Sequence, residues 1–544
     1  MINTEQLSTI KRVILDHCAS KDSVAYIAGG VPRDLGIRNY FKDIDVVAQH
    51  MDRFLEVLTN RLAIEKIEYK IHQQTHNISV TLRAPFQLTT TSTNHILRFM
   101  EDVDIEISQY QKNEEITGGD RDFTINAMHI AIGEDTQDIF DDRQCVIKPY
   151  GVKISGAAVY DVDDPNMIVP VNSESIASNP LRIFRAADLI SRFGYEPSGA
   201  LYRDCLEYTK TINEDNCPAG VRHAALQIIN KMFSETYVIR RSITEDVKPR
   251  NFINLIRALN FLAEINAWTI INPHIQRMVK TLHVSTWHND TVWKHTMNVL
   301  KGIYQISQTY VSSNYITSDV EVCLLWAAFL HDVGKPCCET VDPDCTTHYY
   351  GHQDAGVIIA QPILKELPLS FEQRKMITTL IQNHMVTKQF HEDEVKHKQY
   401  HILRRLLYDL GNEVTYQAWI VLNTADCWAS LRTTHTYPSQ LPTMKALNDI
   451  RKNEIDWFKY EPVLTGAEIE EELHCDKRLI KCYLEQLLEV AMKNYSEVDT
   501  KEHAIHYIHT LGKEWKDAQL SAGAFMKLHG QIFYKDFPFI GKAK

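Results

Sequence analysis

The sequence predicts an α+β N-terminal head followed by a long, mainly helical remainder. The first 150 residues mix helical stretches with short β-rich runs, which read VAYIA, DIDVVA, ISVTL and DVDIEIS. From about Asn179 onward, strand patterns almost vanish. Segments such as PLRIFRAADLISRF, RNFINLIRALNFLAEI and CYLEQLLEVAMK instead repeat apolar residues at helical spacing.

Length and composition indicate a multidomain globular chain. Its 544 residues exceed the roughly 100–200 residues of one domain, and 44% hydrophobic residues leave ample apolar material for several cores. No apolar run approaches the roughly 20 residues of a membrane-spanning helix, and the N-terminal sequence lacks the pattern of an export signal. The 11 cysteines form no CxxC pairs, which fits a reducing compartment. We therefore expect a cytoplasmic protein without a membrane partner.

The net charge of −12 argues against indiscriminate binding to nucleic acid, and we expect no DNA partner. The net charge does not exclude an RNA substrate, because RNA binding depends on local clusters of basic residues on the protein surface and not on the summed charge. Candidate breaks near 161–170, 272–274 and 437–442 divide the chain into four predicted parts: 1–150, 151–272, 273–440 and 441–544.

The most informative stretch of the head reads AYIAGGVPRDLGIRNYFKDIDVVA. Its first β-run ends in Gly29 and Gly30, which let the backbone bend tightly and turn its N–H groups toward an anion. The second β-run carries Asp43 and Asp45, which point to the same side because they lie two apart on a strand. Such paired carboxylates suit Mg²⁺ shared with substrate phosphates. Either element alone is better explained by a turn or a solvated strand edge. Their combination at this spacing, together with DRDFTINAM at 120–128, favours the functional interpretation.

These motifs resemble the class II tRNA nucleotidyltransferase (CCA-adding enzyme) and poly(A) polymerase family, whose heads carry a GG-x-V-R-D loop, a D-x-D pair and an R-R-D-F-T-I-N-A motif. The resemblance implies a polymerase-beta-like nucleotidyltransferase head in which Asp43 and Asp45 bind Mg²⁺ and Glu106 is the third catalytic acid, with Asp104 as the alternative. It implies a nucleotide-binding site that includes Gly29, Gly30, Arg33, Asp34, Arg121, Asp122 and Asn126. Gln111 and Asp120 replace two arginines of the family and remove positive charge near a triphosphate.

The segment SNPLRIFRAADLISRFGY resembles the family's E-D-P-L-R-x-L-R-A-x-R-F, whose Asp and first Arg read the incoming base. The resemblance adds Arg182 and Arg185 to the nucleotide site, but the acidic pair has become Ser178 and Asn179. A carboxylate only accepts hydrogen bonds, whereas an amide both accepts and donates, so Asn179 predicts weaker discrimination of C and A from U and G. Alternatively, Asn179 is a helix N-cap ahead of Pro180, and the two roles can coexist.

A second set of ligand-type residues surrounds an adjacent His331-Asp332 pair, with His295 upstream and Asp426 downstream. Imidazole and carboxylate ligands suit Mg, Mn, Fe, Co, Ni or Zn. The order resembles the HD superfamily of metal phosphohydrolases, which implies an all-α HD domain that binds a divalent transition metal or Mg²⁺. By that resemblance His352 and His384 are further metal ligands, and His288 contacts a substrate phosphate. Lys335 either neutralises a phosphate or is solvated, and we interpret His283 and His348 as bystanders.

The order of these motifs predicts a nucleotidyltransferase head, a helical neck that reads the base and binds RNA, an HD domain and a helical tail. By resemblance, the head transfers nucleotides from CTP and ATP to the 3′ end of tRNA or another RNA. The HD domain then acts on RNA 3′ or cyclic phosphates. Two alternatives remain: a nucleotidyltransferase of altered base specificity that modifies RNA, and an HD hydrolase whose head is a degenerate RNA-binding scaffold.

Overall fold

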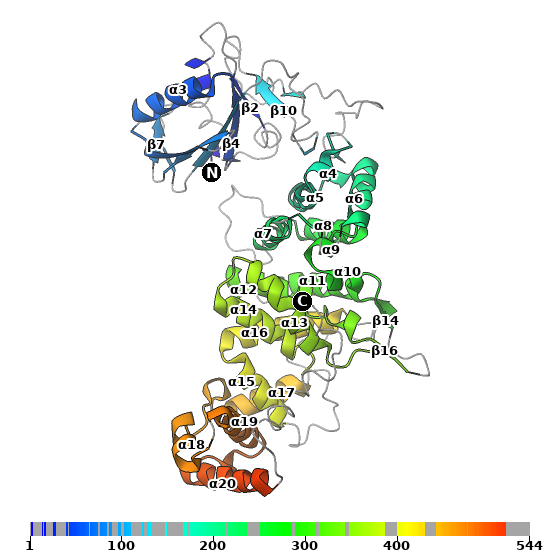
Figure 1. The fold of residues 1–544 in the computed structure, drawn as a ribbon, viewed down its shortest axis with the longest axis vertical. Coiled ribbons are helices and arrows are strands. Elements are labelled where there is room, and N and C mark those ends of the chain that lie inside the picture. The colour runs from blue at the N-terminus through cyan, green and yellow to red at the C-terminus, as the bar shows by residue number, and fades with distance from the viewer. Residues whose placement is uncertain are drawn as a thin grey trace. The chain divides into compact units, whose positions relative to one another are not determined.

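The computed structural model describes two compact units, Met1–Val279 with Glu366–Pro368, and Lys280–Lys365 with Leu369–Lys544 (Figure 1). The described residues are 2–3, 13–14, 16–17, 25–28, 40–41, 43–64, 66–73, 77–83, 86–89, 96–99, 103–109, 122–123, 128–131, 147–149, 167–171, 173–212, 216–218, 220–236, 251–284, 289–309, 315–342, 347–386, 400–429, 442–475 and 477–517. Each unit is taken by itself below.

The head is built on a seven-stranded mixed sheet with the order β11-β10-β2-β4-β9-β6-β5 (Figure 1). Strands β4 and β9 run parallel at its centre, and the other neighbours are antiparallel. The strands are β2 Ala25–Ala28, β4 Asp43–Ala48, β5 Tyr69–Gln73, β6 Asn77–Leu82, β9 Val103–Gln109, β10 Met128–Ala131 and β11 Ile147–Pro149. Two further pairs are β1 Ile2–Asn3 with β3 Tyr40–Phe41 and β7 Phe86–Thr89 with β8 Ile96–Phe99. The β-runs predicted from the sequence are thus confirmed as β2, β4, β6 and β9.

The two faces of this sheet differ because side chains alternate along each strand. One face is apolar and is covered by α3 (Met51–Ile64), which buries Phe54, Leu58 and Leu62 against it. The strands contribute Ala25, Ile27, Ile44, Val46, Ala48, Ile78, Val80, Leu82, Ile105 and Ile107 to this core. Burying one such large apolar side chain stabilises the fold by about 1.5–3 kcal/mol. The strand register is therefore strongly specified, and the alternate positions are left for polar side chains.

The neck is helical, as predicted. Its elements are β12 Met167–Ile168, α4 Ser175–Ser178, α5 Leu181–Phe193, β13 Glu196–Pro197, α6 Gly199–Thr211, α7 Val221–Ser234, α8 Phe252–Glu264, α9 Trp268–Ile271 and α10 Pro273–Met278. Helix α5 ends at Gly194, whose φ of 74° is left-handed and whose N–H bonds the carbonyl of Ile190 at 2.8 Å. The left-handed φ favours glycine there, and a Cβ at Gly194 would also lie 2.9 Å from the Asn254 amide, which would have to shift.

The second unit consists mainly of helices. They are α11 Val292–Thr309, α12 Ser318–Leu330, α13 His352–Glu366, α14 Phe371–Asn383, α15 Tyr400–Leu410, α16 Glu413–Trp428, α17 Pro442–Asn453, α18 Gly466–Leu473, α19 Lys477–Lys493 and α20 Lys501–Asp517. Helix α12 is buried almost all round, as its continuous apolar sequence requires. Two short hairpins, β14 Leu282–Val284 with β15 Asn289–Thr291 and β16 Thr340–Val341 with β17 Thr347–His348, were not predicted. Strands of two or three residues are too short to show a period of two.

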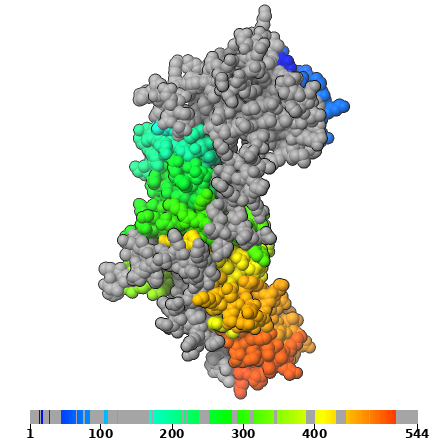
Figure 2. Space-filling model, turned by 180° about the vertical axis from the view of Figure 1, so that it is seen from behind, coloured from blue at the N-terminus to red at the C-terminus, as the bar shows by residue number. Residues whose placement is uncertain are grey.

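The last helices of the second unit are joined by hydrogen bonds between distant segments. Arg404 of α15 donates two hydrogen bonds of 2.7 Å to the Glu454 carboxylate and a third to the carbonyl of Met492. A bidentate pair of this kind adds directional specificity as well as energy. Helices α18 and α20 form the orange-to-red surface at the C-terminal end of the described chain (Figure 2). Among the described helices, none is long and apolar enough to cross a membrane.

Candidate active sites

The polar face of the head sheet carries an acidic cluster, Asp45, Asp104 and Glu106. In the parallel pairing of β4 with β9, Asp45 lies beside Glu106 and Asp43 lies beside Asp104. Neighbours in register share a face and are roughly 5 Å apart, so the pairing brings acids from two distant segments together. The side chain of Asp43 lies outside the described residues; its backbone occupies the first position of β4.

The two candidates for the third acid differ in their surroundings. Asp104 is half-buried, and its Oδ1 accepts a hydrogen bond of 2.6 Å from the Thr81 hydroxyl on β6. Glu106 is exposed on the strand next to Asp45. The carboxylate beside Asp45 is therefore also the more accessible one.

Most of the predicted triphosphate site falls outside the described residues, namely Gly29, Gly30, Arg33, Asp34, Arg121 and Asn126, together with the altered positions Gln111 and Asp120. Asp122 is described and is buried. Its Oδ1 accepts from the N–H of Phe123 at 2.8 Å, and its Oδ2 lies 2.9 Å from Nε of Arg185. The motif of the head is therefore joined directly to helix α5 of the neck.

The predicted base-reading residues of the neck take part in local hydrogen bonds. Asn179 is exposed, and its Oδ1 accepts from the N–H of Leu181, the first residue of α5, at 3.1 Å. This is the capping bond of the alternative interpretation, and base reading by Asn179 remains a prediction. Arg182 is buried and donates to the carbonyl of Ser175 at 2.9 Å and to the Ser178 hydroxyl at 3.3 Å.

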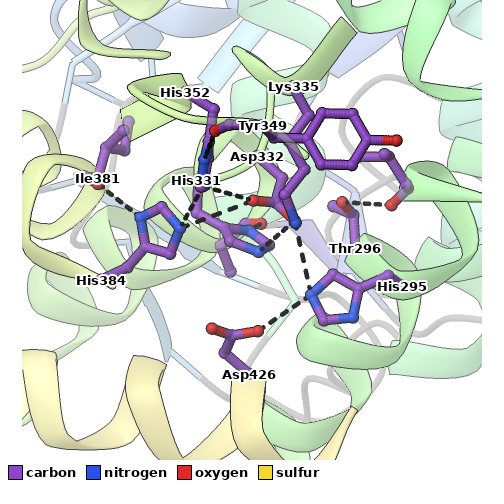
Figure 3. Close-up of polar contacts among 12 residues, drawn as sticks. His295, Thr296, His331, Asp332, Lys335, Tyr349, His352, Ile381, His384 and Asp426 are labelled. Carbon is purple, nitrogen blue, oxygen red and sulfur yellow. Dashed lines mark hydrogen bonds and ion pairs between the residues drawn. The ribbon is translucent and has the colours of Figure 1, made fainter. Parts of the chain in front are cut away.

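The second unit brings all six predicted metal-ligating residues of the HD motif into one buried cluster (Figure 3). They come from five helices or helix ends: His295 from α11, His331 and Asp332 from the end of α12, His352 from the start of α13, His384 from the end of α14 and Asp426 from α16. The set spans about 130 residues of sequence, so only the tertiary fold joins them. We call this set the HD cluster.

Asp332 is the centre of the HD cluster (Figure 3). Its Oδ2 lies 3.2 Å from Nε2 of His331 and 3.6 Å from Nε2 of His295, whose Nε2 also contacts Asp426 Oδ1 at 3.0 Å. Its Oδ1 lies 3.4 Å from Nε2 of His352 and 3.6 Å from Nε2 of His384. Two groups result in which the ligand atoms lie within 4.8 Å of one another: His295, His331 and Asp426; and Asp332, His352 and His384.

The backbone sets the orientation of three imidazoles in the HD cluster. Nδ1 of His331 lies 2.8 Å from the carbonyl of Ala328, and Nδ1 of His384 lies 2.7 Å from that of Ile381. Nδ1 of His352 likewise lies 2.7 Å from the carbonyl oxygen of Tyr349. A carbonyl only accepts, so each of these rings carries a proton on Nδ1, and its Nε2 faces the other residues of the cluster. Metal-ligating histidines are typically held by such an outer hydrogen bond.

Burial and neighbouring charges set the protonation of the HD cluster. Burial lowers the pKa of His295 and lowers that of His384 to about 4, so both are neutral at pH 7. Burial alone would lower the pKa of His331 too, but the carboxylates of Asp332 and Asp426 raise it. Burial alone would raise the pKa of Asp332, yet His331 and Lys335 hold it well below its usual range. The centre therefore combines an ionised carboxylate with imidazole nitrogens, a donor set that suits a divalent cation.

Close backbone packing brings the ligand-bearing helices together. A Cβ on Gly334 would lie 2.1 Å from the carbonyl of His352, so only glycine allows the turn after His331-Asp332 to meet the start of α13. A Cβ on Gly302 would lie 3.1 Å from the Cα of Ala425, next to Asp426. Helices α11 and α16 are therefore in near contact where His295 meets Asp426.

Two residues beside the HD cluster extend or correct the predictions. Lys335 is not solvated: it is only 4% exposed, and its Nζ lies 2.6 Å from Asp332 Oδ2. Tyr349 was missed; its ring centroid lies 5.8 Å from Nζ of Lys335, and its hydroxyl donates to the carbonyl of Leu282. No spacing in the sequence distinguishes this tyrosine. His348 contacts Asp342 instead of the cluster, and the side chains of His283 and His288 lie outside the described residues.

Comparisons with known proteins identify the head. Residues 25–144 match the family profile of the poly A polymerase head domain. The sheet and its acidic face thus belong to a poly A polymerase head. The resemblance predicted from the motifs, to the class II tRNA nucleotidyltransferase and poly(A) polymerase family, is confirmed.

Curated relatives match part of the chain. The Multifunctional CCA protein of Actinobacillus pleuropneumoniae serotype 5b is 24% identical over 266 residues, which are 48% of this chain and 53% of that protein. The A-adding tRNA nucleotidyltransferase of Deinococcus radiodurans is 36% identical over 94 residues, 17% of this chain and 21% of that protein. The chain thus spans about half the length of the first relative. A solved structure of the Thermotoga maritima CCA-adding enzyme complexed with tRNA has a TM-score of 0.47 and 12% identity, covering 94% of this chain and 96% of that one.

The HD cluster generates a prediction about metal binding. Purified protein dialysed against Mn²⁺, Co²⁺, Ni²⁺ or Zn²⁺ should retain metal, measured by elemental analysis, and chelation should lower its melting temperature. His331→Ala should weaken this binding at least about 100-fold, because even outer-shell partners of metal sites contribute 10–100-fold. The matched control is His348→Ala, which removes a histidine outside the cluster and should bind metal as the wild type does. Equal metal content in the two variants would contradict the assignment.

Proposed function

We propose that this chain is a metal-dependent nucleotidyltransferase that adds nucleotides from CTP and ATP to the 3′ end of tRNA or another RNA, as in CCA addition or repair. The observation that carries the proposal is the β4–β9 register, which brings Asp45 beside Glu106 inside a segment that matches a poly A polymerase head. The relatives named as a CCA protein and an A-adding enzyme support the same reaction class.

In this proposal, Asp43 and Asp45 hold the metal and Glu106 is the third catalytic acid. The exposed position of Glu106 beside Asp45 favours it over Asp104. Mg²⁺ bound there would activate the 3′-hydroxyl and stabilise the leaving pyrophosphate. Gly29 and Gly30 turn backbone N–H groups toward the triphosphate. The remaining contacts come from Arg33, Asp34, Arg121, Asp122 and Asn126, with Asn179, Arg182 and Arg185 on the neck.

We also propose that the HD cluster, in an HD domain over 273–440, is a second and independent active site for phosphoester hydrolysis. A divalent cation held there would lower the pKa of its bound water and polarise a phosphoryl oxygen. Asp332 and Asp426 supply carboxylate oxygens and the histidines supply ring nitrogens, while the ammonium of Lys335 holds Asp332 in place. The favoured substrates are RNA 2′,3′-cyclic or terminal 3′ phosphates. Water that attacks a terminal 3′ phosphate releases inorganic phosphate and frees the 3′-hydroxyl. Water that attacks a 2′,3′-cyclic phosphate breaks one P–O bond, and breaking the bond to the 3′ oxygen leaves a 2′ phosphate and a free 3′-hydroxyl, the nucleophile that the head uses.

The role of the acidic face is tested by nucleotide transfer to RNA lacking its terminal CCA, with Mg²⁺ and each nucleoside triphosphate separately. Asp45→Ala should lower the rate at least about 10²-fold, as expected for losing one group that stabilises transition-state charge. Glu106→Gln should be more damaging than Asp104→Asn. Asp52→Ala, which removes an exposed acid from helix α3 of the same head, is the control. Near-normal transfer by folded Asp45→Ala would refute the assignment.

Base selection is tested at Asn179. If its amide contacts the incoming base, Asn179→Asp should sharpen the preference for CTP and ATP over UTP and GTP. One good base contact provides about 1–3 kcal/mol of discrimination, or roughly tenfold and more in relative kcat/KM. Both residues can cap α5, so helix stability serves as an internal control. Unchanged relative kcat/KM for all four nucleotides would mean that Asn179 does not contact the base and only caps the helix.

Hydrolysis is tested with RNA ending in a 2′,3′-cyclic or 3′ phosphate. His331→Ala and Asp332→Asn should abolish opening of the cyclic phosphate and release of phosphate from the 3′-phosphate end. Both variants should leave nucleotide addition to an intact 3′-hydroxyl nearly unchanged, because the two sites share no residues. Asp45→Ala should strongly reduce nucleotide addition and leave phosphoester hydrolysis nearly unchanged. A wild-type protein that releases no phosphate with Mg²⁺, Mn²⁺, Co²⁺ or Ni²⁺ would rule out this activity.

A further inference from the structure

We propose that Asp122, in the RDFTINA motif of the head, is a positioning residue for base selection. It orients two of the arginines of α5: Arg185 by a direct ion pair and Arg182 through Ser175. This inference rests on the proposed nucleotidyltransferase function. It replaces the expectation that Asp122 serves the triphosphate site by direct contact with the nucleotide.

The direct link is an ion pair between a buried and an exposed group. The side chain of Asp122 is 3% exposed, and its Oδ2 lies 2.9 Å from Nε of Arg185, whose side chain is 54% exposed. A buried carboxylate requires a partner of opposite charge. The contact of Nε with the Asp122 carboxylate restricts the orientation of the planar Arg185 guanidinium. Much of the Arg185 side chain is nevertheless exposed to solvent.

The second link runs through Ser175. Its hydroxyl donates to the carbonyl of Asp122 at 2.9 Å. The Nη1 of Arg182 donates to the carbonyl of Ser175 at 2.9 Å and contacts its hydroxyl oxygen at 3.2 Å. Arg182 is 8% exposed, and a buried guanidinium N–H without a hydrogen-bond partner would destabilise the fold, so these hydrogen bonds hold its side chain in place. Both arginines that the family resemblance places in the nucleotide site thus converge on one residue of the head.

The backbone attachment around Asp122 does not depend on its carboxylate. The N–H of Val171 donates to the Asp122 carbonyl at 3.3 Å, and Phe123 pairs with Pro170 in an antiparallel bridge. Phe123 is fully buried. A variant that loses only the ion pair therefore keeps the bonds and the buried ring that hold this segment to the neck.

This arrangement predicts a change in specificity more than a loss of chemistry. Selecting a base requires hydrogen-bond donors held within a few tenths of an ångström and about 10–20°. The acids of the head lie on β4 and β9, in separate segments from Asp122. Releasing Arg185 should therefore lower the preference among nucleotides while the rate with the preferred nucleotide falls less.

The test compares Arg185→Gln, Asp122→Asn, their double variant and Arg185→Lys in the full-length protein. Relative kcat/KM is measured for the four nucleoside triphosphates with one RNA, beside melting temperatures. Each single variant should reduce the preference for the best nucleotide by about tenfold, the size expected for one charge-assisted hydrogen bond. The double variant should be no worse than either single one, and Arg185→Lys should recover part of the preference. Arg192→Gln is the matched control, because this arginine lies on the same helix and pairs with Asp188 at 3.7 Å.

Three outcomes overturn the inference. Additive effects in the double variant would mean that the two residues act separately. An unchanged preference in Asp122→Asn, or a lower melting temperature with an unchanged preference, would mean that the pair only joins segments. In each case an active wild type leaves the proposed function intact. A wild type that transfers no nucleotide to any tested RNA would refute the proposed function, and the inference with it.

Discussion

The burial of one charged carboxylate, Asp332, is the constraint that the helical unit depends on. The residue is 1% exposed, and a buried ion costs several kcal/mol unless opposite charges and hydrogen bonds surround it. Nε2 atoms of four histidines and the ammonium of Lys335 lie within 3.6 Å of its oxygens. The helices that bring those groups must all reach the same point. Their arrangement and the requirement for glycine at Gly334 follow from that demand.

A second buried carboxylate has the opposite character. Asp122 forms an ion pair with Arg185 through Oδ2, and its Oδ1 accepts a hydrogen bond from the N–H of Phe123. Asp332 lies among several groups that can ligate a metal, whereas the surroundings of Asp122 are suited to holding segments together. Asp332 and Asp122 are similarly buried, but their surroundings favour metal ligation by Asp332 and a positioning role for Asp122. Residue type and burial alone do not decide between these roles; the number and kind of neighbours do.

The two proposed activities complement each other chemically. A 3′ or cyclic phosphate removes the nucleophile that nucleotide addition needs, and hydrolysis restores it. The acidic face of the head consists of exposed and half-buried carboxylates, which suits a hydrated Mg²⁺ shared with a triphosphate. The HD cluster is buried and rich in imidazole, which suits a metal held chiefly by the protein. The two proposed metal sites thus differ in the type and exposure of the side chains that would hold the metal.

Local sequence predicted the main strands and helices and the candidate site residues. The alternation in DIDVVA and DVDIEIS predicted β4 and β9, and the motif spacing identified the HD residues, because side-chain periodicity and ligand type are properties of short segments. It did not determine that Asp45 pairs with Glu106, since register depends on how apolar faces pack against α3. It also left Lys335 undecided between solvent and the site, and it missed Tyr349. Tertiary structure decided these points, because burial and the pairing of charges depend on distant segments that short-range patterns do not describe.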